Sequence, residues 1–156
     1  MPSSRDQIRM TDREIAEFLA QGRTLAVATN TLDGAPHLVA MWYALIDGKI
    51  TFWTYRKSQK AVNLRRDPRL TCMLESGATY GDLRGIQLQG RATLVEDTET
   101  VRAIGEAIYR RNASADGELT PAQLQIIAAQ APKRIAVIVE PASVASWDHA
   151  KLGALR

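Results

Sequence analysis

Basic residues gather in one short stretch of the chain, FWTYRKSQKAVNLRRDPR, which is the best candidate for a chemically active segment. It starts like a buried aromatic strand and continues as a short helix, for which Ser58 is a good N-cap residue. Amide groups at a helix start lack intrahelical acceptors and lie at the positive end of the helix dipole. Because Lys57 and Lys60 flank this start, the sequence predicts an anion site here, with a solvated basic surface as the alternative. Three arginines further along are assigned to the surface: Arg65, Arg66 and Arg69.

The other reactive residue types form no recognisable catalytic motif. The two histidines, His37 and His149, and the single cysteine, Cys72, match no zinc-binding or nucleophile spacing, so we expect no metal site. We expect His37 to lie on the surface and Cys72 to be a buried thiol within a strand. Glycine-rich nucleotide-binding fingerprints are also missing. An enzyme with this sequence therefore needs a bound organic cofactor to carry the reaction.

Length and composition predict one ordinary globular domain over residues 1–156, with terminal tails at 1–10 and 148–156. A hydrophobic content of 46% and a charged content of 24% exclude a disordered chain. We expect no secretory signal, and no apolar run approaches the roughly 20 residues of a membrane span. A cytoplasmic protein that binds no membrane fits these features. The net charge of +3 permits anionic ligands, but the basic residues are too clustered for a nucleic-acid interface.

Hydrophobic periodicity predicts a mainly β chain with inserted helices. Thr11 and Glu14 form a capping box that starts a helix over Asp12–Gln21. An Asp-Gly pair marks a tight turn between a long strand, HLVAMWYALI, and the strand KITFWTY; with TLAVATNT before them, these make three consecutive antiparallel strands. Gly90 falls on an inward position of the strand GIQLQGRATLVED, which predicts a bulge or a close backbone approach. The remaining segments are the strands RLTCMLE and KRIAVIVEPASVASW, helices over 58–67, 98–111 and from 121, and a coil tail, DHAKLGALR.

The segment FWTYRKSQKAVNLRRDP resembles the phosphate-binding segment of the pyridoxamine-phosphate-oxidase-like, flavin-binding split-barrel superfamily. The pattern there is an aromatic strand ending in Thr, then Ser-x-Lys, then a short helix closed before Pro. Six positions follow it without a gap: Phe52, Thr54, Ser58, Lys60, Leu64 and Pro68. The order of elements is similar over nearly the whole chain. The resemblance implies a six-stranded antiparallel split β-barrel, assembled as a homodimer with the cofactor at the subunit boundary.

Two departures from the oxidase pattern bear on the cofactor. Leu38 and Tyr43 stand where the oxidase has an Arg and a Lys for the flavin phosphate, and the oxidase's C-terminal substrate-phosphate residues have no match in VASWDHAKLG. The chain is more similar to the branch that binds the deazaflavin coenzyme F420 than to a pyridoxamine phosphate oxidase. That similarity implies hydride transfer from the reduced coenzyme to an unsaturated or quinone-like small molecule. The alternatives are an FMN-binding reductase of the same fold and a non-catalytic coenzyme-binding or carrier protein.

The matching positions carry the binding roles that the resemblance implies. Ser58 and Lys60 would bind the coenzyme phosphate, and Asn63, one helical turn after Lys60, would hydrogen-bond the same region. Lys57, and less directly Arg56, would add positive potential for the phosphate or for the anionic tail of the coenzyme.

The coenzyme ring is expected beside the neighbouring strands. Met41 and Tyr43, together with Thr54, would face it, whereas Trp42 points to the opposite face of its strand because side chains alternate. We expect Trp42 and Trp53 to lie in the core or in a dimer interface.

The end of the chain is expected either to close the barrel or to reach the site of the neighbouring subunit. Trp147 and Lys151 are the residues concerned. The acceptor would take its proton from water, from Tyr43 or from His149, and these three alternatives stay open.

Overall fold

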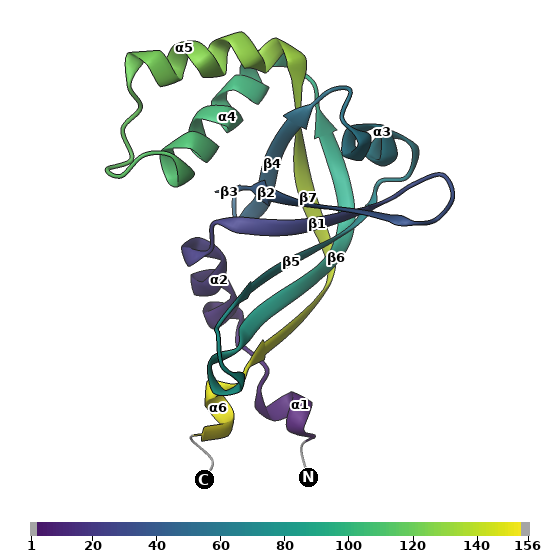
Figure 1. Ribbon diagram of the computed structural model, residues 1–156, viewed down its shortest axis with the longest axis vertical. Helices are drawn as coiled ribbons and strands as arrows, with labels where there is room; N and C mark the ends of the chain where they lie inside the picture. The colour runs from purple at the N-terminus through teal and green to yellow at the C-terminus, as the bar shows by residue number, and fades with distance from the viewer. Residues whose placement is uncertain (1–2, 154–156) are drawn as a thin grey trace.

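Seven strands form one antiparallel sheet in the computed structural model, which describes residues 3–153 (Figure 1). Their order across the sheet is β2-β1-β5-β6-β7-β4-β3. The strands are β1 (Thr24–Asn30), β2 (Pro36–Trp42), β3 (Ala44–Ile46), β4 (Lys49–Tyr55), β5 (Arg69–Ser76), β6 (Arg84–Val95) and β7 (Arg134–Asp148). Since β2 and β3 are consecutive in the chain but lie at opposite edges, the sheet curls into a split barrel. The predicted mainly β split barrel is confirmed, with seven strands in the described residues where six were expected.

The extra strand arises because the predicted long strand HLVAMWYALI breaks at Tyr43. Its backbone carbonyl accepts hydrogen bonds from Arg111 Nη1 at 3.0 Å and from Asn112 Nδ2 at 3.1 Å, so it is diverted from strand pairing. Upstream of the break, β2 pairs with β1, and downstream β3 pairs with β4. The expectation of three consecutive antiparallel strands is therefore wrong, because the chain crosses at Tyr43 from one edge of the sheet to the other.

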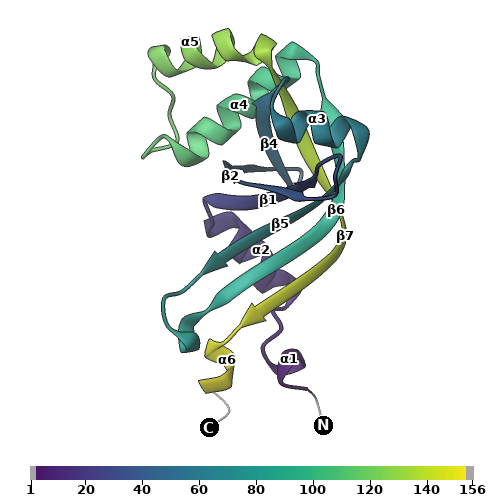
Figure 2. The same ribbon diagram turned by 45° about the vertical axis from the view of Figure 1, so that its right-hand side comes forward.

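The helices cover the ends and one outer side of the barrel. They are α1 (Ser4–Gln7), α2 (Asp12–Gln21), α3 (Gln59–Arg66), α4 (Thr98–Asn112), α5 (Pro121–Gln130) and α6 (Ala150–Gly153), with short 3-10 turns at Tyr80–Asp82 and Ala131–Lys133. The capping box of Thr11 and Glu14 is confirmed: Glu14 N donates to Thr11 Oγ1 at 3.3 Å, and Thr11 N donates to Glu14 Oε2 at 2.6 Å. Figure 2 shows α4 and α5 together at one end of the molecule, and α1 and α6 at the other.

The two predicted tails are more ordered than expected. Asp148 is the last residue of β7, and α6 replaces part of the predicted coil, whose final residues, 154–156, lie outside the described part. Lys151 on α6 donates to Glu14 Oε2 at 2.7 Å and to the Arg9 carbonyl at 2.8 Å. At the other terminus, Met10 is buried in the core.

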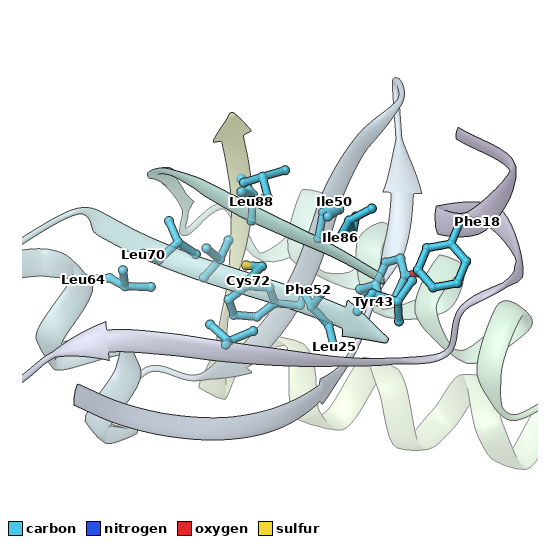
Figure 3. Packing of buried hydrophobic residues seen from close by; sticks show 14 of the residues in the cluster. Phe18, Leu25, Tyr43, Ile50, Phe52, Leu64, Leu70, Cys72, Ile86 and Leu88 are labelled. Atoms are coloured by element: carbon cyan, nitrogen blue, oxygen red, sulfur yellow. The ribbon is translucent and has the colours of Figure 1, made fainter. Parts of the chain in front are cut away.

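Two hydrophobic clusters lie on opposite faces of β4. The first fills the barrel, where Leu25, Phe52, Cys72 and Ile86 are among the fully buried side chains (Figure 3). The second lies between the sheet and α4–α5: Ala44, Trp53, Val101, Ile104, Ile108, Ile127, Ala131 and Ala136. Because β4 is covered on both sides, five consecutive residues of this strand are buried.

Local details confirm two further predictions from the sequence. Cys72 is a free, buried cysteine, and burial raises its pKa to about 12. The register of β6 against β7 shifts between Gln89 and Gly90, and a Cβ on Gly90 would lie 2.2 Å from the carbonyl oxygen of Glu140. A glycine is therefore required at this bulge because the neighbouring backbone approaches it closely.

Candidate functional site

The side chains at the end of β4 and the start of α3 form a connected polar cluster. Lys60 Nζ donates to Thr54 Oγ1 at 3.0 Å, and Thr54 Oγ1 lies 3.0 Å from Ser58 Oγ. Ser58 is the N-cap of α3, as predicted, and its hydroxyl accepts from the amide of Ala61 at 3.2 Å. Three of the residues predicted to bind phosphate or ring thus contact one another directly.

Lys60 is a partly buried cation that lacks an acidic partner. No carboxylate lies within ion-pair distance of it in the part of the chain that the structure describes. Burial lowers the pKa of its ammonium group, and the positive charge of Arg134 lowers it further. An ammonium group has three donors, of which Thr54 accepts one. Lys60 therefore retains both charge and hydrogen-bonding capacity for an anion.

Asn63 lies beneath the site and holds α3 in place; it is not exposed to a ligand. It is fully buried, its Nδ2 donates to Thr29 Oγ1 at 3.0 Å, and its Oδ1 accepts from Gln59 Nε2 at 2.8 Å. The amide has thus found partners on β1 and within α3. The predicted contact of Asn63 with the coenzyme is corrected, because the side chain instead fixes α3 against the barrel.

The two basic residues before Ser58 differ in their surroundings. The guanidinium of Arg56 donates to the carbonyls of Pro132 at 3.1 Å and Glu96 at 2.8 Å, so it ties the loop to the rest of the fold. These bonds to neutral carbonyls leave the charge of Arg56 in place, so its predicted contribution of positive potential stays a prediction. Lys57 is exposed next to the helix start, and its role as a source of positive potential stays a prediction. Arg65 donates to the carbonyl of Arg56 at 2.7 Å and forms an ion pair with Glu96.

Tyr43 does not face a ligand site. Its side chain is fully buried among core residues (Figure 3), its hydroxyl donates to the Leu19 carbonyl at 2.6 Å, and the guanidinium of Arg111 lies 4.3 Å from the ring centroid. Burial raises its pKa above the ordinary value. A side chain held in this way neither contacts a ring nor delivers a proton to one, so both predicted roles of Tyr43 are corrected. Met41, by contrast, is half-buried and packs at the edge of the core.

The split between β2 and β4 contains a hollow that the sequence did not reveal. Its volume is ≈ 370 Å³, and its lining includes Met41, Trp42, Trp53, Tyr109 and Arg134. On the side of β4 that β3 covers, pairing ends at Thr51, so the strand edge from Phe52 to Tyr55 faces the split without a strand partner among residues 3–153.

Arg134 links the hollow to the cluster around Lys60. It lines the hollow, and its positive charge contributes to the lowered pKa of Lys60. The side chains of Trp53 and Thr54 lie on opposite faces of β4, because side chains alternate along a strand. Trp53 is buried and Trp42 is 46% exposed, so the first is a core residue as predicted and the second is a wall of the hollow.

Arg134 is a basic residue of the site that sequence reasoning missed. It is the first residue of β7 and lies directly opposite Tyr55 in the sheet. Its guanidinium carbon lies 4.3 Å from the ring centroid of Trp53 and 4.0 Å from that of Tyr55. Because this contact depends on the pairing of two distant strands, no local pattern in the sequence could have indicated it.

Trp147 and His149 lie far from Lys60 within one chain. Both are near the end of β7 and α6, whereas α3 is at the opposite end of the barrel in both views (Figures 1 and 2). Trp147 stands over Gly85, and His149 Nδ1 lies 2.9 Å from the Tyr80 carbonyl. Their predicted roles at a site across a subunit boundary stay predictions.

The residues present fit a phosphate better than a metal ion. Within residues 3–153, no group of three or more His, Cys, Asp and Glu side chains is arranged to hold a metal. The site instead offers the Lys60 ammonium, the hydroxyls of Thr54 and Ser58, and the amides of Gln59 and Lys60 in the first turn of α3, which have no acceptor within their own helix. Among the described residues, no helix is long and apolar enough to span a membrane.

Several solved structures have a similar fold, and the proteins in them are described as having different functions or none that is known. A conserved hypothetical protein, Rv2991 from Mycobacterium tuberculosis, is 43% identical over 97% of this chain and 93% of its own, with a TM-score of 0.87. A structure described as an F420 reductase is 22% identical and covers 92% of this chain and 98% of its own, with a TM-score of 0.63. A heme storage protein from Vibrio cholerae is 16% identical and covers 89% and 97%, with a TM-score of 0.68. At the two lower identities the likeness concerns the fold alone.

A family model gives the assignment that the fold and the site had indicated. Comparison with curated proteins found no match. The model described as pyridoxamine 5'-phosphate oxidase, in contrast, matches residues 11–148, which include the whole sheet and the Ser58–Lys60 segment. The chain therefore belongs to the pyridoxamine 5'-phosphate oxidase family, whose members share the flavin-binding split barrel.

Proposed function

We propose that this protein is a homodimeric reductase that binds the deazaflavin coenzyme F420 and transfers a hydride from it to an unsaturated or quinone-like small molecule. The observation that carries the proposal is Lys60, a partly buried ammonium held by Thr54 beside the N-cap of α3 and lacking an acidic partner in the described residues. Burying such a charge is costly unless an anion completes it. A coenzyme phosphate supplies that anion.

The choice of F420 over FMN is supported by the two positions that depart from the oxidase pattern. Leu38 is 67% exposed on the outer face of β2, and Tyr43 is buried in the core, so neither offers a charge to a phosphate. FMN would therefore lose two charge-assisted hydrogen bonds of about 1.5–3 kcal/mol each. F420 carries further negative charges on its tail, to which Lys57 and Arg134 are available.

The chain's own residues bind and orient the coenzyme, which supplies the hydride when it is bound. Lys60, Thr54 and Ser58 would hold the phosphate, and the hollow between Trp42 and Trp53 would receive the ring. Met41, Trp42 and Trp53 would give the ring apolar contacts there. The hydroxyl of Tyr43 is buried and bonded to a backbone carbonyl, so it does not donate a proton to the acceptor. The proton comes from water or His149, as predicted, or from the phenol of Tyr109, which lines the hollow.

The homodimer is supported by a central patch on the outer face of the sheet that contains no charged side chain and is bounded on β5 by Arg69 and Glu75. Residues of β1, β2, β5, β6 and β7 meet there in register: Ala26, Ala28, Leu38, Ala40, Trp42, Thr71, Met73, Gln87, Gln89, Ser143 and Ala145. Leu38, Trp42 and Met73 are 67%, 46% and 38% exposed. Such a depletion of charge is typical of interface cores, and a stable interface buries about 800 Å² on each partner. The cytoplasmic location expected from the sequence stays a prediction.

Titration with oxidised F420 and, separately, with FMN tests the proposal. We expect F420 to bind in the micromolar range and FMN to bind more weakly, as followed by fluorescence. Lys60→Met should weaken F420 binding by about tenfold or more, because one charge-assisted contact is lost. Lys57→Met is the matched control, since it removes the same charge from an exposed position and should cost only about twofold. Light scattering on the same sample should give the mass of a dimer.

Each outcome bears on a separate part of the proposal. Tight binding of FMN alone favours the FMN reductase, and binding of neither compound refutes the coenzyme site. Equal affinities of the wild type and Lys60→Met refute the phosphate role of Lys60. If F420 binds but no quinone or activated alkene takes the hydride, the carrier alternative gains support. A monomer in light scattering contradicts the dimer.

A further inference from the structure

Arg134 is a cation fixed in the wall of the split without an acidic partner. Its Nε donates to Gln130 Oε1 at 3.0 Å, and in the described part of the chain its two terminal nitrogens contact no acceptor. No Asp or Glu within residues 3–153 forms an ion pair with it. The side chain is half-buried and lines the hollow. Because burying an unpaired charge is costly, a half-buried arginine of this kind is a candidate for binding an anionic ligand.

The rings of Trp53 and Tyr55 fix the guanidinium in place. They lie 4.3 and 4.0 Å from its central carbon, and Trp53 is itself held edge-on by Tyr109, with ring centroids 6.2 Å apart. A guanidinium whose orientation is fixed in this way loses little entropy when it binds a planar anion through two parallel hydrogen bonds. The geometry therefore suits a carboxylate or phosphate oxygen pair arriving through the hollow.

Arg134 and Lys60 also form a region of concentrated positive charge. The positive charge of Arg134 contributes to the lowered pKa of Lys60, and neither side chain forms an ion pair with an Asp or Glu among the residues that the structure describes. Like charges that repel each other in the empty protein are both stabilised when an anionic ligand occupies the space beside them.

We propose that Arg134 is a specificity-determining residue that binds a carboxylate or phosphate group of the ligand in the split. The inference rests on the proposed function, because it assumes that the hollow receives the coenzyme and its acceptor. The anionic group belongs either to the tail of the coenzyme or to the acceptor. In the second case the acceptor is a planar, acidic compound such as a quinone carboxylate.

Two matched pairs of probes separate these sources in direct binding measurements. The coenzyme pair is F420 and the deazaflavin riboside that lacks its phosphate and glutamates. The acceptor pair is anthraquinone-2-carboxylate and its neutral carboxamide. Each is titrated into wild-type protein, Arg134→Met and Arg134→Lys, with binding followed by calorimetry. Arg110→Met is the control, because it removes an exposed arginine whose partner is Glu106 and which does not line the hollow.

The expected result is a selective loss of affinity for the anionic member of at least one pair. Arg134→Met should weaken it by about tenfold or more, and Arg134→Lys by less, because a lysine keeps the charge but not the planar fork. The neutral members and the control variant should change by no more than about twofold. The pair that responds identifies the source of the anion.

The opposite results overturn the inference in distinguishable ways. If Arg134→Met weakens both members of each pair equally, or neither, Arg134 only supports the aromatic residues and does not select ligands. That result leaves the proposed function intact as long as F420 still binds. If neither deazaflavin binds but the carboxylate still depends on Arg134, the proposed coenzyme fails and the anion selectivity stands. If no probe binds to the wild type, both proposals fail.

Discussion

Replacing Arg111 tests whether the break that creates the split is held by one side chain. Arg111 is near the end of α4, and its guanidinium donates to the carbonyls of Tyr43 at 3.0 Å, Leu19 at 2.8 Å and Ala20 at 3.0 Å, with a further contact to the carbonyl of Gly22. The carbonyls of Leu19, Ala20 and Gly22 lie at the C-terminal end of α2, where backbone carbonyls have no amide donor within the helix. The same guanidinium covers the ring of Tyr43. Arg111 thus joins α2, α4 and the end of β2.

The loss expected for Arg111→Met is about 3 kcal/mol in the free energy of unfolding. A hydrogen bond to a charged donor contributes about 1.5–3 kcal/mol, but the freed carbonyls regain part of this from water, so the three bonds of ordinary length do not add fully. Methionine keeps the apolar stem and thereby limits the packing loss. For a domain with a total stability of about 5–15 kcal/mol, a loss of this size is easily measured.

Urea unfolding of the wild type and three variants provides the measurement. Arg111→Lys should lose roughly half as much, since an ammonium keeps the charge at the end of α2 but cannot reach all the carbonyls. Arg110→Met, the exposed neighbour, should change the free energy by less than about 0.5 kcal/mol. A loss below about 1 kcal/mol for Arg111→Met, or one equal to that of Arg110→Met, would refute the reasoning, since net contributions of about 1 kcal/mol are ordinary for a single hydrogen bond.

Two further predictions concern titration and reactivity. The hydrogen bond from Lys151, together with that from the Thr11 amide, lowers the pKa of Glu14 from 4.5 to about 2. The ionised carboxylate therefore stabilises the fold at pH values above its unfolded pKa. This contribution to stability is lost as the pH falls from about 4.5 toward 2. Lys151→Met should flatten the acid side of the stability curve in that window, and an NMR titration that places wild-type Glu14 at an ordinary pKa contradicts this. Burial raises the pKa of Cys72 to about 12, so a disulfide reagent at pH 8 should label the thiol only after urea unfolds the protein. Rapid labelling of the folded protein would show that β5 opens locally.

Local rules predicted most elements because each depends on residues close together in the chain. The capping box of α2, the Ser58 N-cap of α3 and the alternation of Leu25, Val27 and Thr29 on β1 are all present as expected. The bulge at Gly90 was also foreseeable, since a glycine on an inward strand position has no side chain to pack and usually marks a bulge or a close backbone approach. These features are determined by helix geometry and strand alternation.

Tertiary contacts account for the places where the predictions from the sequence failed. The strand through Tyr43 looked continuous because its residues favour β structure, but Arg111 and Asn112, almost seventy residues later, take the backbone carbonyl out of the ladder. The same dependence on distant partners removed Asn63 from the predicted ligand set. Its residue type suits a phosphate, and only the structure shows that the side chain is buried and donates to a threonine hydroxyl on β1.

The break at Tyr43 also accounts for the lack of a second cation at that position in this family member. A lysine there would have to place its ammonium among Phe18, Leu25 and Leu74, where desolvation of a charge is prohibitive. Tyrosine instead fills the space, and its hydroxyl satisfies a carbonyl at the end of α2. Tyr43 therefore stabilises the crossing and offers no charge to a ligand. Positive charge for the proposed ligand would have to come from outside the barrel core, from Arg134 in the wall of the hollow and from Lys60 at the start of α3.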